Sequence, residues 1–85
     1  MNRKYTVYSE HKTTLSCVVD ASRDIKPQLE EVLMIKRGSG IGLRLSEREI
    51  ELIDYFGNSS MASFKILSAE DTDEPVSLKW TVVGQ

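Results

Sequence analysis

The stretch "IGLRLSEREIELID", residues 41–54, decides the fold, because its two halves follow different patterns. The first five residues alternate apolar side chains with glycine and arginine, which predicts a short strand over 41–45. The next four, Ser-Glu-Arg-Glu at 46–49, match a capping box, in which the serine hydroxyl accepts a hydrogen bond from the third following amide. We therefore expect an amphipathic helix over 46–57 that ends at a glycine and an asparagine.

The predicted helix over 46–57 would turn Ile50, Ile53 and Phe56 toward the core. Leu45 before the capping serine and Ile50 after it have the spacing of a hydrophobic staple. The side chains that would face water are Glu47, Arg48, Glu51 and Asp54.

A second amphipathic pattern precedes this stretch and predicts a helix over 25–37. Its apolar stripe consists of Ile25, Leu29, Val32 and Leu33. Pro27 is tolerated in the first turn, and Lys36 and Arg37 suit the negative end of the helix dipole. Gly38 suits the left-handed position just past the end.

Four further segments have the composition of β-strands and predict two hairpins. Residues 4–9 and 13–20 would form the first hairpin. Residues 63–69 and 76–83 would form the second, joined by the polar turn Glu-Asp-Thr-Asp-Glu-Pro. The clean alternation of the last segment predicts that one side of the sheet faces water.

Together these elements predict a single small α+β domain over residues 1–85, a mostly antiparallel sheet with two amphipathic helices packed on one face. The predicted order is β-β-α-β-α-β-β. A sheet of this size has exposed edge strands, and such an edge pairs readily with a second copy or with a partner. The sequence is therefore compatible with a homodimer.

The composition narrows the classes of function. The chain has 11 basic and 13 acidic residues, and a net charge of −2 is too small for the whole molecule to attract nucleic acid by its field. A single cysteine excludes an internal disulfide. The N-terminal residues contain no apolar run typical of a signal peptide, and no window is long and apolar enough for a membrane span, so we expect a cytoplasmic protein.

Three glycines, Gly38, Gly40 and Gly42, lie beside a Lys-Arg pair and raise the question of a phosphate-binding loop. Such loops run from a strand through glycines into a helix N-terminus, whereas these glycines follow a predicted helix and lead into a strand. We interpret them as a helix stop, a turn and a point of close backbone approach. A small-ligand or phosphate-binding protein that uses the loop 38–42 remains a second alternative function.

Catalytic and metal-binding chemistry has little support in the sequence. His11 is the only histidine and fits a loop, and Cys17 within a strand fits a small core residue. The acidic residues of 70–74 lack the length and glycine of a calcium loop. Trp80 and the tyrosines fit either a core or a partner-binding surface. We expect no enzymatic activity, no cofactor and no metal.

The segment 41–57 resembles the strand and first helix of ribbon-helix-helix DNA-binding domains. In that family outward strand residues enter the major groove from a dimer, and Gly42 and Arg44 hold those positions here. The resemblance needs a second helix over 61–70, where the apolar spacing allows a helix as well as a strand. It implies an alternative function as a dimeric nucleic-acid-binding regulator, with basic contacts from Arg44, Arg48, Lys36 and Arg37.

The leading interpretation is a small non-enzymatic protein-binding module, a regulator or inhibitor that acts through protein–protein contact. It follows because no catalytic constellation is visible and a chain this short has little room for one. The expected contact surface is the polar face of the predicted helix 46–57 with the adjoining strand. The expected partner-binding residues are Arg44, Arg48, Glu51 and Tyr55.

Overall fold

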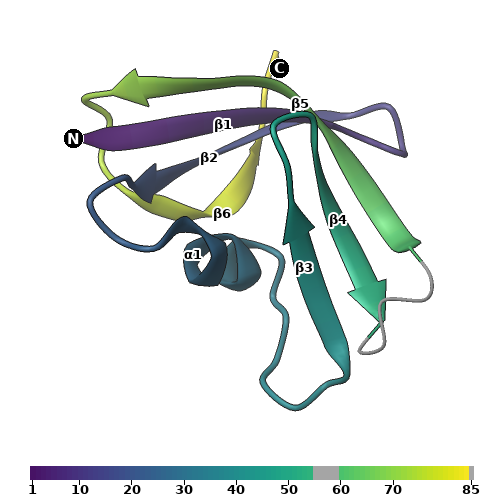
Figure 1. The fold of residues 1–85 in the computed structure, drawn as a ribbon. Helices are drawn as coiled ribbons and strands as arrows, with labels where there is room; N and C mark the ends of the chain where they lie inside the picture. Colours follow the sequence, from purple (N-terminus) through teal and green to yellow (C-terminus); the bar gives the residue numbers. More distant parts are fainter. Residues whose placement is uncertain (55–59, 85) are drawn as a thin grey trace.

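A six-stranded antiparallel sheet and one helix make up the structure, a computed structural model that describes residues 1–54 and 60–84 (Figure 1). The elements are β1 (Asn2–Ser9), β2 (Thr14–Asp20), α1 (Ile25–Val32), β3 (Ile41–Leu45), β4 (Glu49–Asp54), β5 (Ser60–Thr72) and β6 (Ser77–Val82). The strands lie in the order β3-β4-β5-β1-β2-β6, so β3 and β6 are the two edges.

The β1–β2 hairpin forms the middle of the fold and confirms the first predicted hairpin. Tyr5 lies opposite Cys17 and Val7 lies opposite Leu15, with these side chains on the inner face of the sheet. Tyr5, Val7 and Cys17 are buried, while Tyr8 on the other face is exposed. The alternation of side chains between the two faces of a strand, expected from the sequence, therefore determines which side of the hairpin packs on the core.

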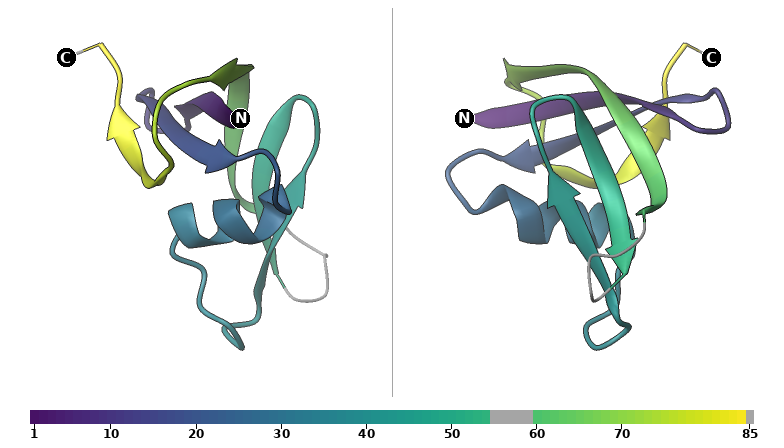
Figure 2. Two further views of the ribbon diagram at one scale, coloured as in Figure 1. Left: turned by 90° about the vertical axis from the view of Figure 1, so that its left-hand side faces the viewer. Right: turned by 45° about the vertical axis from the view of Figure 1, so that its right-hand side comes forward.

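Strand β5 curls the sheet. It pairs with β1 and with β4, and each pairing contains a register shift. The shift against β1 leaves Leu67 without a partner in the ladder, and the shift against β4 leaves Met61 without one; both side chains are exposed. Such bulges bend a strand and increase its twist. The sheet consequently curls, as the ribbon shows (Figure 2). The rings of Phe64 in β5 and Trp80 in β6 lie with centroids 5.6 Å apart, although β1 and β2 separate their strands in the sheet.

Helix α1 covers the inner side of the curled sheet and contacts β2, β3 and β6. Leu29 and Val32 point from it into the core. The side-chain amide of Gln28 accepts a hydrogen bond from the N–H of Asp20 (2.7 Å) and donates to the Asp20 carbonyl (2.8 Å) and the Asp24 carbonyl (3.0 Å). Gln28 thus bonds to the end of β2 as a neighbouring strand would.

Buried apolar side chains from β1, β2, α1, β3 and β4 form one core. Its members are Tyr5, Val7, Cys17, Val19, Leu29, Val32, Leu43 and Ile50. Trp80 packs against this cluster, and its buried Nε1 finds no hydrogen-bond partner among the described residues. Tyr5 is therefore a core residue, and Trp80 is partly buried against the core.

The predicted second helix is wrong over residues 49–54, which form strand β4. Ile50 is buried on the inner face, whereas Ile53 lies on the opposite face, so the two do not share the helical face expected for them. Phe56 and the Gly57-Asn58 stop lie outside the described residues. The fold is accordingly mostly sheet with one described helix, and not the predicted arrangement with two.

The predicted C-terminal hairpin is also wrong, although both of its strands exist. Residues 61–70 belong to β5, which resolves the open choice between strand and helix. β5 pairs with β1 and β4, whereas β6 pairs with β2 on the other side of the β1–β2 hairpin. The connection between β5 and β6 therefore crosses the ends of β1 and β2 instead of making a tight turn.

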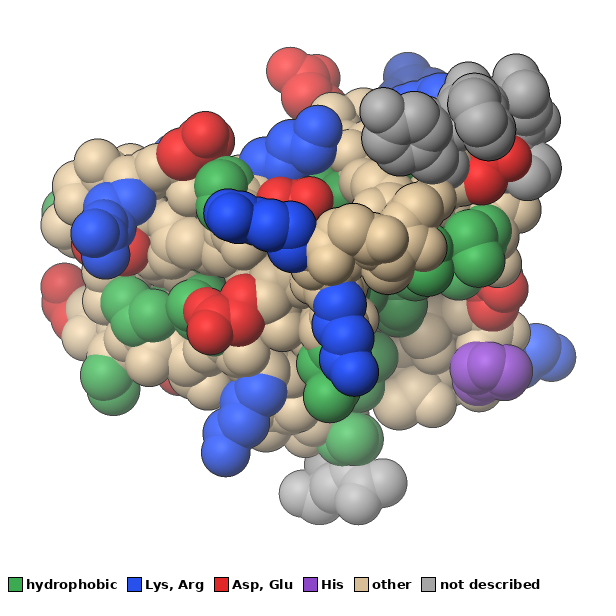
Figure 3. Space-filling model, turned by 90° about the horizontal axis from the view of Figure 1, so that it is seen from below, with side chains coloured by type: hydrophobic (Ala, Val, Ile, Leu, Met, Phe, Trp, Pro, Cys, Tyr) green, Lys and Arg blue, Asp and Glu red, His purple; other side chains and the backbone are tan. Residues whose placement is uncertain are grey.

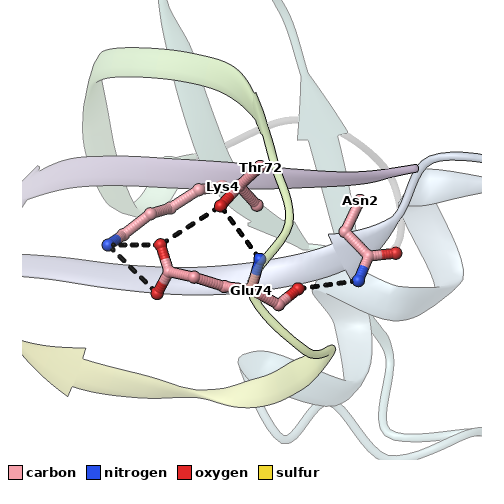
Figure 4. A network of polar contacts seen from close by, with 4 residues as sticks. All are labelled: Asn2, Lys4, Thr72 and Glu74. Atoms are coloured by element: carbon pink, nitrogen blue, oxygen red, sulfur yellow. Dashed lines mark hydrogen bonds and ion pairs between the residues drawn. The ribbon is translucent and has the colours of Figure 1, made fainter.

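Glu74 fastens this crossing connection to β1 (Figure 4). Its carboxylate accepts from Lys4 Nζ at 3.0 and 3.4 Å and from the Thr72 hydroxyl at 3.2 Å, and its carbonyl accepts from the Asn2 side chain at 2.8 Å. The hydrogen bond and charge of Lys4 lower the pKa of Glu74. The acidic turn residue Glu74 is thus a structural clamp.

Helix α1 ends at Val32, five residues earlier than predicted, because a C-terminal cap intervenes. Met34 is left-handed (φ 59°), and the amides of Met34 and Ile35 bond to the carbonyls of Glu31 and Glu30 at 3.0 Å each. This is the Schellman pattern, with methionine where glycine is usual. In the described ranges no helix is long and apolar enough to cross a membrane.

Alanine substitution separates the strand from the predicted helix. Because Ile50 is fully buried, Ile50→Ala should lower the free energy of unfolding by about 2–5 kcal/mol. Ile53→Ala, on the outer face, should cost clearly less, as measured by urea unfolding of both variants. Equal losses at the two positions would indicate the shared helical face and contradict strand β4.

The Glu74 clamp predicts a pH dependence of stability. A carboxyl whose folded pKa is lowered contributes stability that is present above its ordinary pKa of 4.5 and is lost as the pH falls through the folded value. Wild type should therefore exceed Glu74→Gln in Tm near neutral pH, and the difference should shrink as the pH falls below 4.5. A difference that stays constant down to pH ~2 would contradict the clamp.

Candidate functional site

Ser46 organises the turn between β3 and β4. Its N–H donates to the Glu49 carbonyl (3.0 Å), and its hydroxyl oxygen accepts from the N–H groups of Glu49 (3.2 Å) and Arg48 (3.3 Å). The Arg48 carbonyl accepts from the N–H of Ile66 (2.8 Å), which joins the turn to β5. These bonds fix the end of the hairpin and hence the register of the pairs that follow.

The outer edge of β3 carries unpaired backbone groups. β3 and β4 pair over five consecutive residues without a register shift. Hydrogen-bonded and non-hydrogen-bonded pairs alternate along an antiparallel ladder, and the Ser46–Glu49 pair at the turn is hydrogen bonded. The residues whose N–H and C=O groups point away from β4 are therefore Ile41, Leu43 and Leu45, and no residue in 1–54 or 60–84 pairs with them as a strand.

The opposite edge, β6, is less suited to pairing. Its ladder with β2 contains a register shift between Ser16 and Val18, and the exposed Lys79 lies near its middle. Bulges and lysines are features by which natural edge strands avoid pairing with other chains. β3 has an unshifted ladder, and its residues Ile41 and Leu45 are partly exposed, whereas Leu43 between them is only 2% exposed.

Two clefts lie between β3 and α1. One, of about 440 Å³, is lined by Asp24, Ile25, Lys26, Leu43, Arg44, Leu45 and Ile53. The other, of about 580 Å³, reaches the start of β3 at Gly40 and Ile41 and is bounded on the helix by Pro27, Glu30 and Glu31. The edge of β3 is thus flanked by open space at both of its ends.

The predicted partner-binding residues fall around this edge in part. Arg44 projects from the outer face of β3 and forms an ion pair with Glu51 of β4 at 3.7 Å, with side-chain exposures of 55% and 16%. Arg48 is exposed in the turn. Arg44 thus lies on a strand as predicted, whereas Arg48 and Glu51 belong to the same hairpin and not to the predicted helix face. Tyr55 lies outside the described residues.

The glycine loop forms no cradle at a helix N-terminus. Gly38 and Gly40 are left-handed (φ 79° each), and the amide of Ser39 bonds to the Lys36 carbonyl (3.2 Å) in a turn. Two carboxylates of α1 and the Lys36-Arg37 pair line the adjacent cleft, so its charge is mixed. Gly42 belongs to β3, where an added Cβ would be in ordinary contact with the Ile53 side chain at 3.7 Å, so the close backbone approach expected at this glycine is not found.

The remaining reactive side chains lie apart from this edge. Cys17 is buried, and burial raises the pKa of its thiol to about 12, so the thiol is protonated at neutral pH. His11 is exposed in the turn between β1 and β2. Within the described part of the chain, no three His, Cys, Asp or Glu side chains group so that they could hold a metal ion.

Charges are mixed on the face seen in Figure 3. Lys and Arg side chains lie among acidic and apolar ones there, without a single-sign patch among the described residues of that view. Nucleic-acid-binding surfaces usually gather basic residues on one face or stripe. This face therefore does not have the charge distribution typical of a nucleic-acid interface.

Comparison with known proteins adds no relative. No family model matches the chain, no curated protein matches it, and no solved structure matches it. The function is therefore argued from the geometry of the chain itself.

Sequence reasoning found the strand 41–45 but missed that it is a free edge beside the helix. The signal for β4 was present, since Glu49-Ile50-Glu51-Leu52 alternates polar and apolar residues as a strand does. The contact of Gln28 with β2 and the clefts beside β3 have no such signal, because they depend on how distant elements meet.

Hydrogen exchange of the dilute protein tests the edge directly. The amides of Ile41 and Leu45 face outward from partly exposed residues and should exchange fast, whereas the amides of Gly42 and Arg44 bond to β4 and should be protected, by roughly tenfold or more. Amide-resolved NMR measures both classes in one sample. Uniform protection or uniform exposure along β3 in dilute protein would contradict the free edge.

Proposed function

We propose that the protein is a non-enzymatic protein-binding module, a regulator or inhibitor, that binds an extended segment of another protein as an added strand at β3. One observation carries the proposal: the outward N–H and C=O groups of the partly exposed Ile41 and Leu45 lie on an unshifted edge. In strand addition the main chain supplies affinity, and alternating side chains supply specificity.

The surroundings of β3 support an extended ligand of defined character. Apolar side chains of the ligand would extend the inner face, next to Leu43 and Leu45 and the cleft beside Ile25. On the outer face, Arg44 is more than half exposed and would lie beside the added strand. A carboxylate at the facing position of the ligand would complement it.

The proposal assigns no catalytic role to any residue. The single thiol is buried and protonated, and the histidine lies in the turn between β1 and β2. The cleft at the glycine loop is lined by both acidic and basic side chains, so it does not attract an anion strongly. The phosphate-binding alternative therefore gains no support.

The nucleic-acid-binding alternative loses the local structure on which its resemblance rested. Residues 49–54 and 61–70 are strands, whereas a ribbon-helix-helix domain needs helices there. Arg44 is also engaged with Glu51. This alternative stays open to experiment, and nuclease treatment distinguishes it.

Capture from lysate of the source cells tests the proposed surface. Tagged protein is incubated with nuclease-treated lysate, and retained proteins are quantified for wild type, for the Arg44→Glu, Arg48→Glu double variant, and for Lys12→Glu in the β1–β2 turn as the control. Charge reversal beside the edge should reduce the retained protein by roughly fivefold or more, since like charges suppress association, and the control should retain it.

Two outcomes would contradict the proposal. Equal retention by the double variant and wild type would show that the surface around β3 is not the binding site. Complete loss of retained protein on nuclease treatment would favour the nucleic-acid alternative.

A further inference from the structure

The connection between α1 and β3 is the longest one that the structure describes. It consists of residues 33–40, whereas the other described connections contain three or four residues. Residues 36–40 are also the longest run of exposed residues within 1–54 and 60–84. The connection projects at the lower end of the molecule in Figure 1, away from the β1–β2 hairpin. Proteases cut folded chains preferentially in exposed loops of this kind.

Few hydrogen bonds hold the exposed part of this loop. Beyond the helix cap, the described backbone bonds of residues 36–40 amount to one, from the Ser39 N–H to the Lys36 carbonyl (3.2 Å). Gly38 and Gly40 lie in open space, with no atom within 4 Å of an added Cβ. An endoprotease binds its substrate segment in extended form, and a loop held by one bond reaches that form by a small local opening.

A dibasic pair occupies this exposed segment. Lys36 and Arg37 are both exposed and are followed by Gly38, Ser39 and Gly40, whose side chains are small or absent. Endoproteases that carry a carboxylate in their specificity pocket cut after arginine or lysine. The bond that follows the pair, between Arg37 and Gly38, therefore has both the side chain and the accessibility that such an enzyme requires.

The other basic residues of the chain are poorer substrates, because regular structure or a short turn holds their backbone. Lys26 lies in helix α1. In the short turns, the backbone N–H groups of Lys12, Arg23 and Arg48 are each hydrogen-bonded within the turn. The remaining basic residues lie within strands: Arg3, Lys4, Arg44, Lys65 and Lys79.

We infer that the peptide bond between Arg37 and Gly38 is a site of limited proteolysis by an endoprotease specific for basic residues, and that the cut protein stays folded as two associated pieces. Hydrolysis adds one water across the amide. The hydroxyl joins the carbonyl carbon of Arg37 to give a carboxylate, the nitrogen of Gly38 becomes an amino group, and no group is oxidised or reduced. The inference goes beyond the proposed function and does not depend on it.

The topology of the sheet holds the two pieces together. Residues 1–37 contain β1, β2 and α1, and residues 38–85 contain β3 to β6. The β1–β2 hairpin lies between β5 and β6, so both of its outer edges pair with strands of the other piece. Leu29 of the first piece belongs to the same buried cluster as Leu43 and Ile50 of the second. Separation would break two ladders and expose this core to water.

Limited digestion of the full-length protein with trypsin tests the site. We expect the first cut between Arg37 and Gly38, identified by intact mass in denaturant, and we expect both pieces to elute together as one species in native gel filtration. A first cut at any other bond would overturn the inference. Pieces that separate in native gel filtration would overturn it as well.

Substitution of the pair tests its role against a matched control. Lys36→Gln together with Arg37→Gln should slow the first cut at least about tenfold, because the specificity pocket of trypsin loses its charged partner. Lys12→Gln, which removes an exposed lysine from the β1–β2 turn, should leave the rate unchanged. Equal rates for the double variant and wild type would overturn the inference.

Ile50→Val distinguishes a local opening of the loop from unfolding of the whole protein. The substitution deletes one buried methyl group and should raise the unfolded population by about two- to tenfold. Cutting through a local opening should keep the wild-type rate, because that opening does not require global unfolding. A rate that rises by the same factor as the unfolded population would show that the folded loop resists the protease, and would overturn the inference.

Discussion

The structure depends on the register that Ser46 imposes on the β3–β4 hairpin. Its N–H and hydroxyl bonds to residues 48 and 49 close a tight turn, so Leu43, Leu45 and Ile50 face inward. A shift by one residue would move every side chain of the hairpin to the other face. The same register turns Arg44 outward. The register set by the Ser46 turn therefore determines both which side chains enter the core and which face the proposed binding edge.

The position of β3 at the edge follows from the way the curled sheet is closed. Bulges in β5 bend the sheet until Phe64 meets Trp80, and α1 fills the inner side with Leu29. The Gln28 side chain hydrogen-bonds to the backbone N–H and C=O of Asp20 at the end of β2, a residue that does not pair with β6. The other edge has a shifted ladder and an exposed lysine. β3 is left as the regular edge, with space beside it.

Local patterns predicted the elements that local chemistry decides. The strands of the first hairpin, the strand 41–45 and the start of α1 at Ile25 were correct. Residues 46–49 led to the wrong prediction of a helix, because their hydrogen bond also occurs at a helix cap. In this hairpin turn, as in a capping box, the serine hydroxyl accepts from the N–H of the third following residue. The pairing of β6 with β2 could not be predicted from the sequence, because strands that are neighbours in the sequence are expected to pair with each other. The connection from β5 to β6 is held by Lys4 and Glu74, which are 70 residues apart. Arg48 and Glu51 were predicted on a helix face and Arg44 on the adjoining strand, whereas all three lie on one β-hairpin.

The central claim is that residues 46–54 continue β3 as a turn and a strand. Nuclear Overhauser effects on uniformly labelled protein test it most directly. Non-hydrogen-bonded antiparallel pairs have Cα atoms about 4.5 Å apart, so a strong effect between the Hα protons of Leu43 and Leu52 is expected, with a second between Leu45 and Ile50. Successive amide–amide effects through Glu49–Asp54 without these cross-strand contacts would show a helix and contradict the account.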